Sequence, residues 1–185
     1  MQSTMMRLSN DGLQFIKRWQ GLSLEPYQDE SGMWVIGHGH IINGADDFDI
    51  AITPEIADAQ LRLDIWCSEA MLRRCLRVTL SPPRFDALVS LTMSSWPTGS
   101  GLLPLIAFIN QENDAIALQF WRQQTSLHGH ESQFLQRLRQ AECRLFNSQC
   151  YPTPAIDETA ARPGYDSSPP AADTALPDAP SPLPR

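Results

Sequence analysis

The chain has 185 residues with 14 basic and 21 acidic side chains, which gives a formal net charge of −7. This length allows one domain of ordinary size with an appendage and excludes a large multidomain assembly. Hydrophobic residues make up 42% of the chain, enough for a packed core, whereas the negative charge lacks the broad cationic field that binding to nucleic acid needs.

The first predicted element is a short helix. Ser9 is a favoured N-cap residue, apolar residues recur at helical spacing from Leu13 to Trp19, and Gly21 follows as a stop signal. We therefore expect a helix that ends near Trp19 or Gln20.

Residues 22–42 carry strand and turn signals. Pro26 and a turn candidate over residues 29–32 interrupt the segment, and residues 33–36 form an apolar run of mainly β-branched and aromatic side chains. We expect a small hairpin or a three-stranded meander here.

A long amphipathic helix is predicted next. Thr53 is a good cap, Pro54 suits the first helical position, and Glu55 places an acid in the first turn. Apolar residues at helical spacing extend the prediction to about Val78.

The rest of the folded part is predicted to be helical. A helix opens at residues 81–83, and the segment 96–101 breaks it. Three further helices are expected over residues 102–109, 113–123 and 132–146. The order predicts an α+β domain, in which a long helix joins a small β lobe to a helical lobe and a ligand cleft lies between them.

Composition changes sharply after Cys150. Residues 151–185 contain nine of the 15 prolines, and large aliphatic residues nearly vanish. Proline removes backbone donors and disfavours both helix and sheet. We expect a domain over residues 1–150 and a disordered Pro/Ala-rich tail over residues 151–185, which acts as a solubilising extension rather than as a proline-rich ligand.

The segment from Gln20 to His40 reads QGLSLEPYQDESGMWVIGHGH. It resembles the signature E-G-L-x-L-x-x-Y-x-D-x-x-G-x-x-T-I-G-x-G-H of the phage-type lysozymes, glycoside hydrolase family 24. Residues 87–91 and 137–146 resemble the buried central helix and the Arg-rich last helix of that family. The resemblance covers residues 9–146 and implies a lysozyme-like fold that cleaves peptidoglycan between N-acetylmuramic acid and N-acetylglucosamine.

The resemblance also places the family's catalytic constellation, E-x8-D-x5-T, on this chain. The general acid position is Gln20, the aspartate beside the anomeric carbon is Asp29, and the threonine that helps to place water is Val35. A carboxamide does not release a proton, and valine has no hydroxyl group.

We therefore expect a peptidoglycan-binding cleft whose muramidase activity is lost or strongly impaired. The alternative is an active hydrolase, endolysin or secreted effector, with a rearranged acid, for which Glu25 is a candidate. A third reading, a phage or prophage structural component that uses the lysozyme fold, is not separated by the sequence.

Four further residues are predicted to contact the substrate. Trp34 offers an aromatic face next to Val35 on the presumed cleft strand, and His40 matches a histidine of the resembling family. The resemblance also implies that Arg137 and Arg139 lie near Gln20, where they would bind anionic groups of the ligand.

The four histidines form two His-Gly-His triplets, His38 with His40 and His128 with His130. Residues i and i+2 of a strand share a face, so either pair could grip a metal. No carboxylate or cysteine stands at ligand spacing beside them, and no C-x-x-C pair occurs. We expect structural or exposed histidines, helix-packing thiols, and neither a metal nor another cofactor.

The expected partners are glycan strands or fragments of peptidoglycan and, as an alternative, a protein. Residues 1–10 hold one basic residue and no apolar run, so no secretory signal or membrane anchor is expected. The protein would be made in the cytoplasm and would reach the periplasm or wall through a holin pore, a secretion system or lysis.

Overall fold

The computed structural model describes residues 6–30, 32–43, 50–95, 101–127 and 130–148. The predicted tail, the helix break at residues 96–100 and His128 lie outside these ranges.

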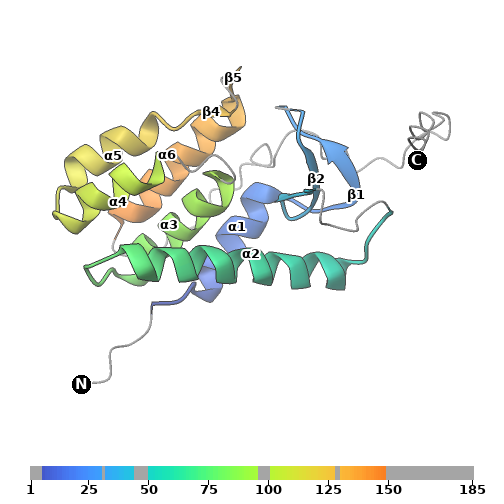
Figure 1. Ribbon diagram of the computed structural model, residues 1–185, viewed down its shortest axis with the longest axis horizontal. Helices are drawn as coiled ribbons and strands as arrows, with labels where there is room; N and C mark the ends of the chain where they lie inside the picture. Colours follow the sequence, from blue (N-terminus) through green and yellow to red (C-terminus); the bar gives the residue numbers. More distant parts are fainter. Residues whose placement is uncertain (1–5, 31, 44–49, 96–100, 128–129, 149–185) are drawn as a thin grey trace, which may run out of the picture.

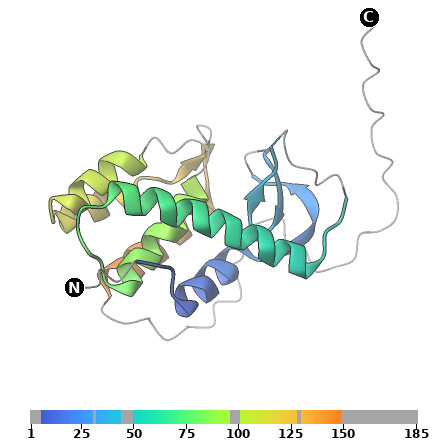
Figure 2. The ribbon, with the colours of Figure 1, turned by 60° about the horizontal axis from the view of Figure 1, so that its bottom comes forward.

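The described elements form a small β lobe and a larger helical lobe, which one long helix joins (Figures 1 and 2). The β lobe holds the antiparallel strands β1 (Ser23–Gln28), β2 (Trp34–Gly37) and β3 (His40–Ile41), in the order β1-β2-β3. The joining helix is α2 (Pro54–Cys75). The lysozyme-like α+β architecture predicted from the sequence is confirmed.

Of the two predicted alternatives, a hairpin and a three-stranded meander, the β lobe forms the meander. Tyr27 of β1 lies opposite Val35 of β2, and Val35 lies opposite Ile41 of β3. Gly37 and Gly39 have φ angles of +62° and +82°, a left-handed conformation that suits glycine and lets the chain reverse between β2 and β3. This reversal decides where the two neighbouring histidines point.

Side-chain caps begin the first two helices as predicted. In α1 (Asn10–Gln20) the Ser9 hydroxyl accepts a hydrogen bond from the Gly12 N–H, and Thr53 does the same for the Ile56 N–H at the start of α2. Gly21 ends α1 with a φ of +68°, and its N–H donates to the Lys17 carbonyl. The cap residues thus fix where both helices start.

The long helix α2 ends at Cys75, three residues before the predicted end at Val78. The side chain of Asn110 caps this end, because its Nδ2 donates to the Cys75 carbonyl at 2.9 Å and its Oδ1 accepts from the Arg77 N–H at 2.7 Å. A tertiary contact therefore sets the boundary. Among the described residues, no helix is long and apolar enough to cross a membrane.

Helix α3 (Pro82–Ser95) is the centre of the helical lobe, and every residue from 85 to 92 is buried. It packs against α1, α2 and the last helix, α6 (Gln133–Asn147). Helices α4 (Leu102–Asn110) and α5 (Asp114–Arg122) pack against each other at the far side of this lobe (Figure 1). The main core therefore lies in the helical lobe.

A second, two-stranded sheet was not predicted. It pairs β4 (Ser126–Leu127) with β5 (His130–Glu131) just before α6. The Glu131 carboxylate accepts hydrogen bonds from the hydroxyls of Thr125 at 2.8 Å and Ser126 at 3.1 Å. Strands of two residues are too short to show an alternation of apolar and polar residues, so the sequence carries no sign of this sheet.

Candidate functional site

Gln20 is the last residue of α1 and is held in the interior. Its side chain is 6% exposed, and its Oε1 has no hydrogen-bond partner among the described residues. A buried amide oxygen that is left unpaired costs about 1–3 kcal/mol. Such a group is typical of a position kept for binding rather than for stability.

Asp29 follows β1 in a tight turn. Its N–H donates to the Met33 carbonyl at 3.0 Å, and its Oδ1 accepts from the Met33 N–H at 3.1 Å. Gly32, with a φ of +77°, donates its N–H to the Asp29 carbonyl at 2.9 Å. The turn thus fixes the carboxylate at the end of the strand.

Val35 and Trp34 are neighbours on β2 and point to opposite faces, as the alternation of a strand requires. Val35 is fully buried, whereas Trp34 is 51% exposed. The methyl groups of Val35 fill the interior without offering a hydrogen bond, and the Trp34 indole is accessible to a ligand.

The two histidines after β2 lie in separate networks. His38 Nδ1 is 2.5 Å from the Gly21 carbonyl oxygen, and its Nε2 is 3.2 Å from Asp58 Oδ1. Lys17 Nζ donates to the same Asp58 oxygen at 2.6 Å and lowers the pKa of that carboxyl group. His38 therefore ties the start of the β lobe to α2.

His40 faces Asp64 of α2, with its Nδ1 3.0 Å from Asp64 Oδ2 and 3.1 Å from the Gln60 amide nitrogen. Because His38 and His40 bond different carboxylates, they do not converge on one point. In the described part of the chain, no cluster of three or more His, Cys, Asp or Glu residues could hold a metal ion.

A hollow of about 260 Å³ opens beside this second network, where the β lobe, α2 and α3 meet. Its walls include His40 and Ile41 from β3, Asp64, Cys67 and Met71 from α2, and Met93 from α3. The mixture of apolar walls with a few polar groups is typical of a ligand site at a junction between lobes.

The predicted arginines differ in their surroundings. Arg137 is exposed on α6, whereas Arg139 is 2% exposed. Arg139 donates to the Glu142 carboxylate at 2.8 Å, to the Ser94 hydroxyl at 2.7 Å and to the Gln124 carbonyl at 2.9 Å. These bonds favour a structural role for Arg139, and neither arginine lines the hollow.

The α2 wall of the site was missed by the sequence analysis. Gln60, Asp64 and Ser68 recur every fourth residue, which gives a polar line along one face of a helix. Ser68 donates to the Asp64 carbonyl at 2.9 Å, and Gln60 donates to the Asp64 carboxylate at 3.0 Å. The four-residue spacing of these polar side chains was the feature of the sequence that could have revealed this wall.

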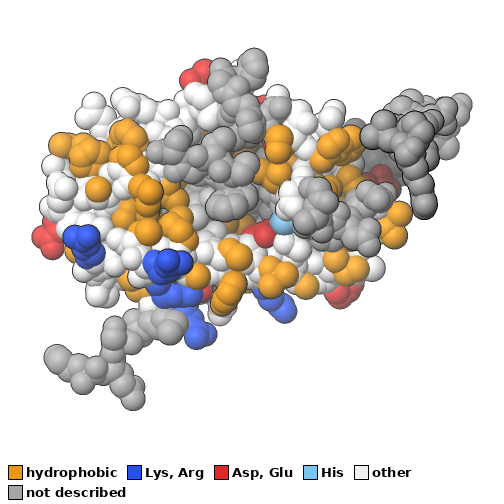
Figure 3. All heavy atoms as spheres, viewed as in Figure 1, with side chains coloured by type: hydrophobic (Ala, Val, Ile, Leu, Met, Phe, Trp, Pro, Cys, Tyr) orange, Lys and Arg blue, Asp and Glu red, His pale blue; other side chains and the backbone are white. Residues whose placement is uncertain are grey.

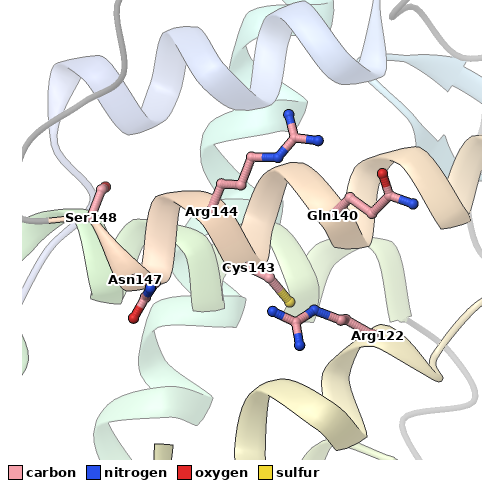
Figure 4. Close-up of a pocket in the computed structure, with 6 residues that line it drawn as sticks. All are labelled: Arg122, Gln140, Cys143, Arg144, Asn147 and Ser148. Atoms are coloured by element: carbon pink, nitrogen blue, oxygen red, sulfur yellow. The ribbon is translucent and has the colours of Figure 1, made fainter. Parts of the chain in front are cut away.

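A second hollow, of about 350 Å³, lies at the end of α6 and is lined by Arg122, Cys143 and Arg144 among others. Figure 4 shows Arg122 reaching toward Cys143 from α5, while Arg144 points to the opposite side of α6. The two guanidinium groups do not converge, and each sits in the last turn of its helix, where a cation is stabilised by the helix dipole. This hollow is a poor candidate for the site.

The sequence matches the profile of the phage lysozymes over residues 17–142. It is 33% identical to an endolysin of Acyrthosiphon pisum secondary endosymbiont phage 1, over 77% of this chain and 99% of that endolysin. The matched residues include Gln20, Asp29 and Val35 and end before the tail.

Two solved structures share the fold. The endolysin from Escherichia coli O157:H7 phage FAHEc1 superposes with a TM-score of 0.68 and 28% identity, over 80% of this chain and 98% of the endolysin. The muramidase domain of SpmX from Asticaccaulis excentricus gives a TM-score of 0.65 and 27% identity, over 77% of this chain and 98% of that domain.

Proposed function

Because the chain belongs to the phage lysozyme family, we propose that it binds the glycan strands of bacterial peptidoglycan in the cleft between its lobes and hydrolyses them poorly or not at all. The observation that carries this proposal is Gln20, a carboxamide at the buried end of α1 where the resemblance expects a proton donor.

The chemistry of glycoside cleavage supports the proposed loss of hydrolytic activity. The departing oxygen needs a proton, and a carboxylic acid supplies it in most glycosidases. The Gln20 amide donates hydrogen bonds but releases no proton, and general acid catalysis is worth about 10²- to 10⁴-fold. Val35 adds a second loss, since a fully buried isopropyl group cannot orient water.

Binding requires no proton transfer, and three features of the described residues support it. The hollow keeps polar side chains, His40 and Asp64, among apolar walls. The exposed indole of Trp34 offers a flat surface that suits the apolar face of a sugar ring. Asp29 retains its carboxylate in a fixed turn.

A hydrolase with a rearranged acid is the second candidate, and Asp64 favours it. Asp64 is a carboxyl group that lines the hollow, although it is bonded to His40 and Gln60. Glu25, the replacement suggested by the sequence, is exposed on β1. In this reading the acid is supplied by a residue outside the family's motif.

Purified protein mixed with isolated cell walls separates the two readings. Under the binding proposal the protein sediments with the walls and releases no muropeptides above the level of an Asp29→Ala variant. Trp34→Ala should weaken sedimentation, whereas Leu103→Ala, which removes an even more exposed apolar side chain on α4, should not. Sustained release that depends on Asp29 or Asp64 would support the hydrolase instead.

We also propose that residues 1–150 carry the binding function and that residues 151–185 are a solubilising tail. Access to the wall would come through a holin pore, a secretion system or lysis. Fusing residues 151–185 to an unrelated protein tests the tail, because a solubilising tail raises the solubility of its host without conferring wall binding.

A further inference from the structure

Helix α2 has apolar residues on two opposite sides. One side packs into the protein through Ala57, Leu61, Ile65 and Leu72, all buried. The other side carries what we call the outer seam, which consists of Ile56, Ala59, Leu63, Trp66 and Ala70. The seam residues follow one another at intervals of three and four, which is the spacing of a coiled-coil interface.

The outer seam faces solvent in the described part of the chain. Ile56 is 45% exposed, Leu63 is 58% exposed and Trp66 is 63% exposed. No described element lies in front of α2 in Figures 1 and 2, and Figure 3 shows hydrophobic side chains in a row along it. Contiguous exposed apolar surface of this kind marks an interaction site.

We propose that the outer seam binds a second copy of this chain, with the two α2 helices packed antiparallel. A seam that follows a heptad along one helix is complementary to itself under a two-fold axis. Such a contact needs no other partner, because both surfaces are present on every molecule.

Charge selects the antiparallel direction. Glu55 lies in the first turn of α2, and Arg73 and Arg74 lie in its last turn. Arg73 is bonded to Glu69 and to the Met6 carbonyl of its own chain, whereas Arg74 is exposed. Antiparallel packing brings Glu55 of one copy beside Arg74 of the other, and it sets the two helix dipoles in opposition. Parallel packing would place like charges beside each other at both ends.

The antiparallel register pairs large residues at the centre and small residues outside. Leu63 of one copy packs on Trp66 of the other, and Ala59 packs on Ala70 of the other, since antiparallel seams alternate the two heptad positions across the interface. Most α2 residues that line the hollow, Asp64, Ser68 and Met71, lie outside the outer seam, and Cys67, one turn from Leu63, borders both surfaces.

Sedimentation velocity of the full chain over a range of concentrations is the first test. The mass should rise from one chain to two, with the weak affinity expected of a short interface. Leu63→Glu and Trp66→Glu should each raise the dissociation constant more than about tenfold. Leu103→Glu is the matched control, because Leu103 on α4 is also 63% exposed, and it should associate like the wild type.

Cysteine cross-linking tests the direction, in a background with Cys67→Ser and Cys150→Ser. Residues 59 and 70 are 11 positions apart, roughly 16 Å along the helix, so they cannot pair within one chain. A mixture of Ala59→Cys and Ala70→Cys chains should give a covalent dimer, whereas neither variant alone should. Cross-linking of each variant with itself would mean parallel packing and would overturn the proposal.

A wild-type chain that stays monomeric at millimolar concentration would overturn the dimer, and so would a dimer that both seam variants leave intact. Wall binding is measured separately, and its failure would count against the proposed function but not against the seam.

Discussion

The Glu30 carboxylate accepts a hydrogen bond of 2.9 Å from the Ser132 hydroxyl, although the two residues are 102 positions apart. Glu30 follows β1, and Ser132 is the N-cap of α6, where its hydroxyl also accepts from the Leu135 N–H at 3.2 Å. One side chain thus caps a helix of the helical lobe and fastens the β lobe to it.

Ser132→Ala should lower the free energy of unfolding by about 1 kcal/mol, because the helix loses its cap and Glu30 loses a donor. Urea denaturation measures the change. Glu30→Gln should cost less than Ser132→Ala, since the cap remains and an amide oxygen still accepts from the hydroxyl. Equal losses in the two variants would mean that the cap contributes nothing.

Gly12 has no room for a side chain. A Cβ at this position would lie 2.5 Å from Cγ of Asp86, which is fully buried and accepts from the Ser9 N–H at 3.0 Å and the Ser9 hydroxyl at 2.6 Å. Gly12→Ala should therefore cost about 1–3 kcal/mol, even though alanine is the better helix former.

Thermal or urea unfolding measures the effect of Gly12→Ala, with Gln14→Ala on the exposed side of α1 as its control. The control should change stability by less than about 0.5 kcal/mol. An alanine at position 12 that stabilises the protein would show that Asp86 moves aside freely.

The buried pair of Arg139 and Glu142 organises the contact between α3, α5 and α6. Glu142 is fully buried and accepts from Arg139, from the Ser90 hydroxyl at 2.7 Å and from the Trp121 indole N–H at 2.9 Å. Arg139→Met should cost about 3–5 kcal/mol, because it leaves a buried carboxylate without its cation.

Arg137→Met is the matched control for Arg139, two positions earlier on the exposed side of α6, and should cost less than about 0.5 kcal/mol. If Arg139→Met unfolds no more easily than Arg137→Met, the buried pair does not stabilise the protein. If Arg139→Met folds stably but no longer sediments with cell walls, Arg139 has the ligand-binding role that the sequence suggested.

Structural features that depend only on neighbouring residues in the sequence were predicted well. Ser9 and Thr53 cap helices because a hydroxyl one residue before a helix bonds the free N–H groups regardless of the rest of the fold. The end of α2 at Cys75 was not predicted, because Asn110 reaches it from α4. The strands β4 and β5 are too short to leave a pattern.

The residues of the candidate site also divide into those that a local motif reveals and those that only the tertiary structure brings together. Gln20, Asp29 and Val35 were named because they lie in one continuous motif. The hollow is lined by other residues, among them Asp64 and Met93, whose helices only the tertiary structure brings to the β lobe. Arg139 was predicted to bind the ligand, but its side chain forms an ion pair with Glu142, a partner three residues away that the sequence analysis did not consider.

Thiol reactivity should separate Cys67 from Cys143. Cys67 is exposed on α2, whereas Cys143 is 3% exposed, and burial raises the pKa of its thiol to about 12. Iodoacetamide should modify Cys67 in the native protein and reach Cys143 only after unfolding, which peptide mass spectrometry resolves. Rapid native labelling of Cys143 would contradict its burial.

The same thiol gives a dependence of stability on pH. Burial raises the pKa of the Cys143 thiol from 9.0 in the unfolded chain to about 12 in the folded protein. The folded state therefore holds the thiol proton more strongly than the unfolded state does. Its contribution is complete below pH 9 and is lost as the pH rises toward 12. Cys143→Ala should flatten the loss of stability in that range.

The combined change Gln20→Glu with Val35→Thr should restore cleavage if only the chemistry was lost. The introduced carboxyl group would replace a side chain that is 6% exposed, and burial there raises its pKa and keeps it protonated, as a proton donor requires. The introduced threonine has nearly the shape of valine and so fits a fully buried position. Muropeptide release from isolated walls should rise by about 100-fold or more.

The rate of the restored enzyme should fall as the pH rises through the pKa of the introduced carboxyl group, and so should the stability of the variant, because the buried charged form is disfavoured. Adding Asp29→Ala should return release to the wild-type level. A double variant that folds, sediments with cell walls and still releases nothing would place the defect in the shape of the cleft, because both lost chemical groups would then be present.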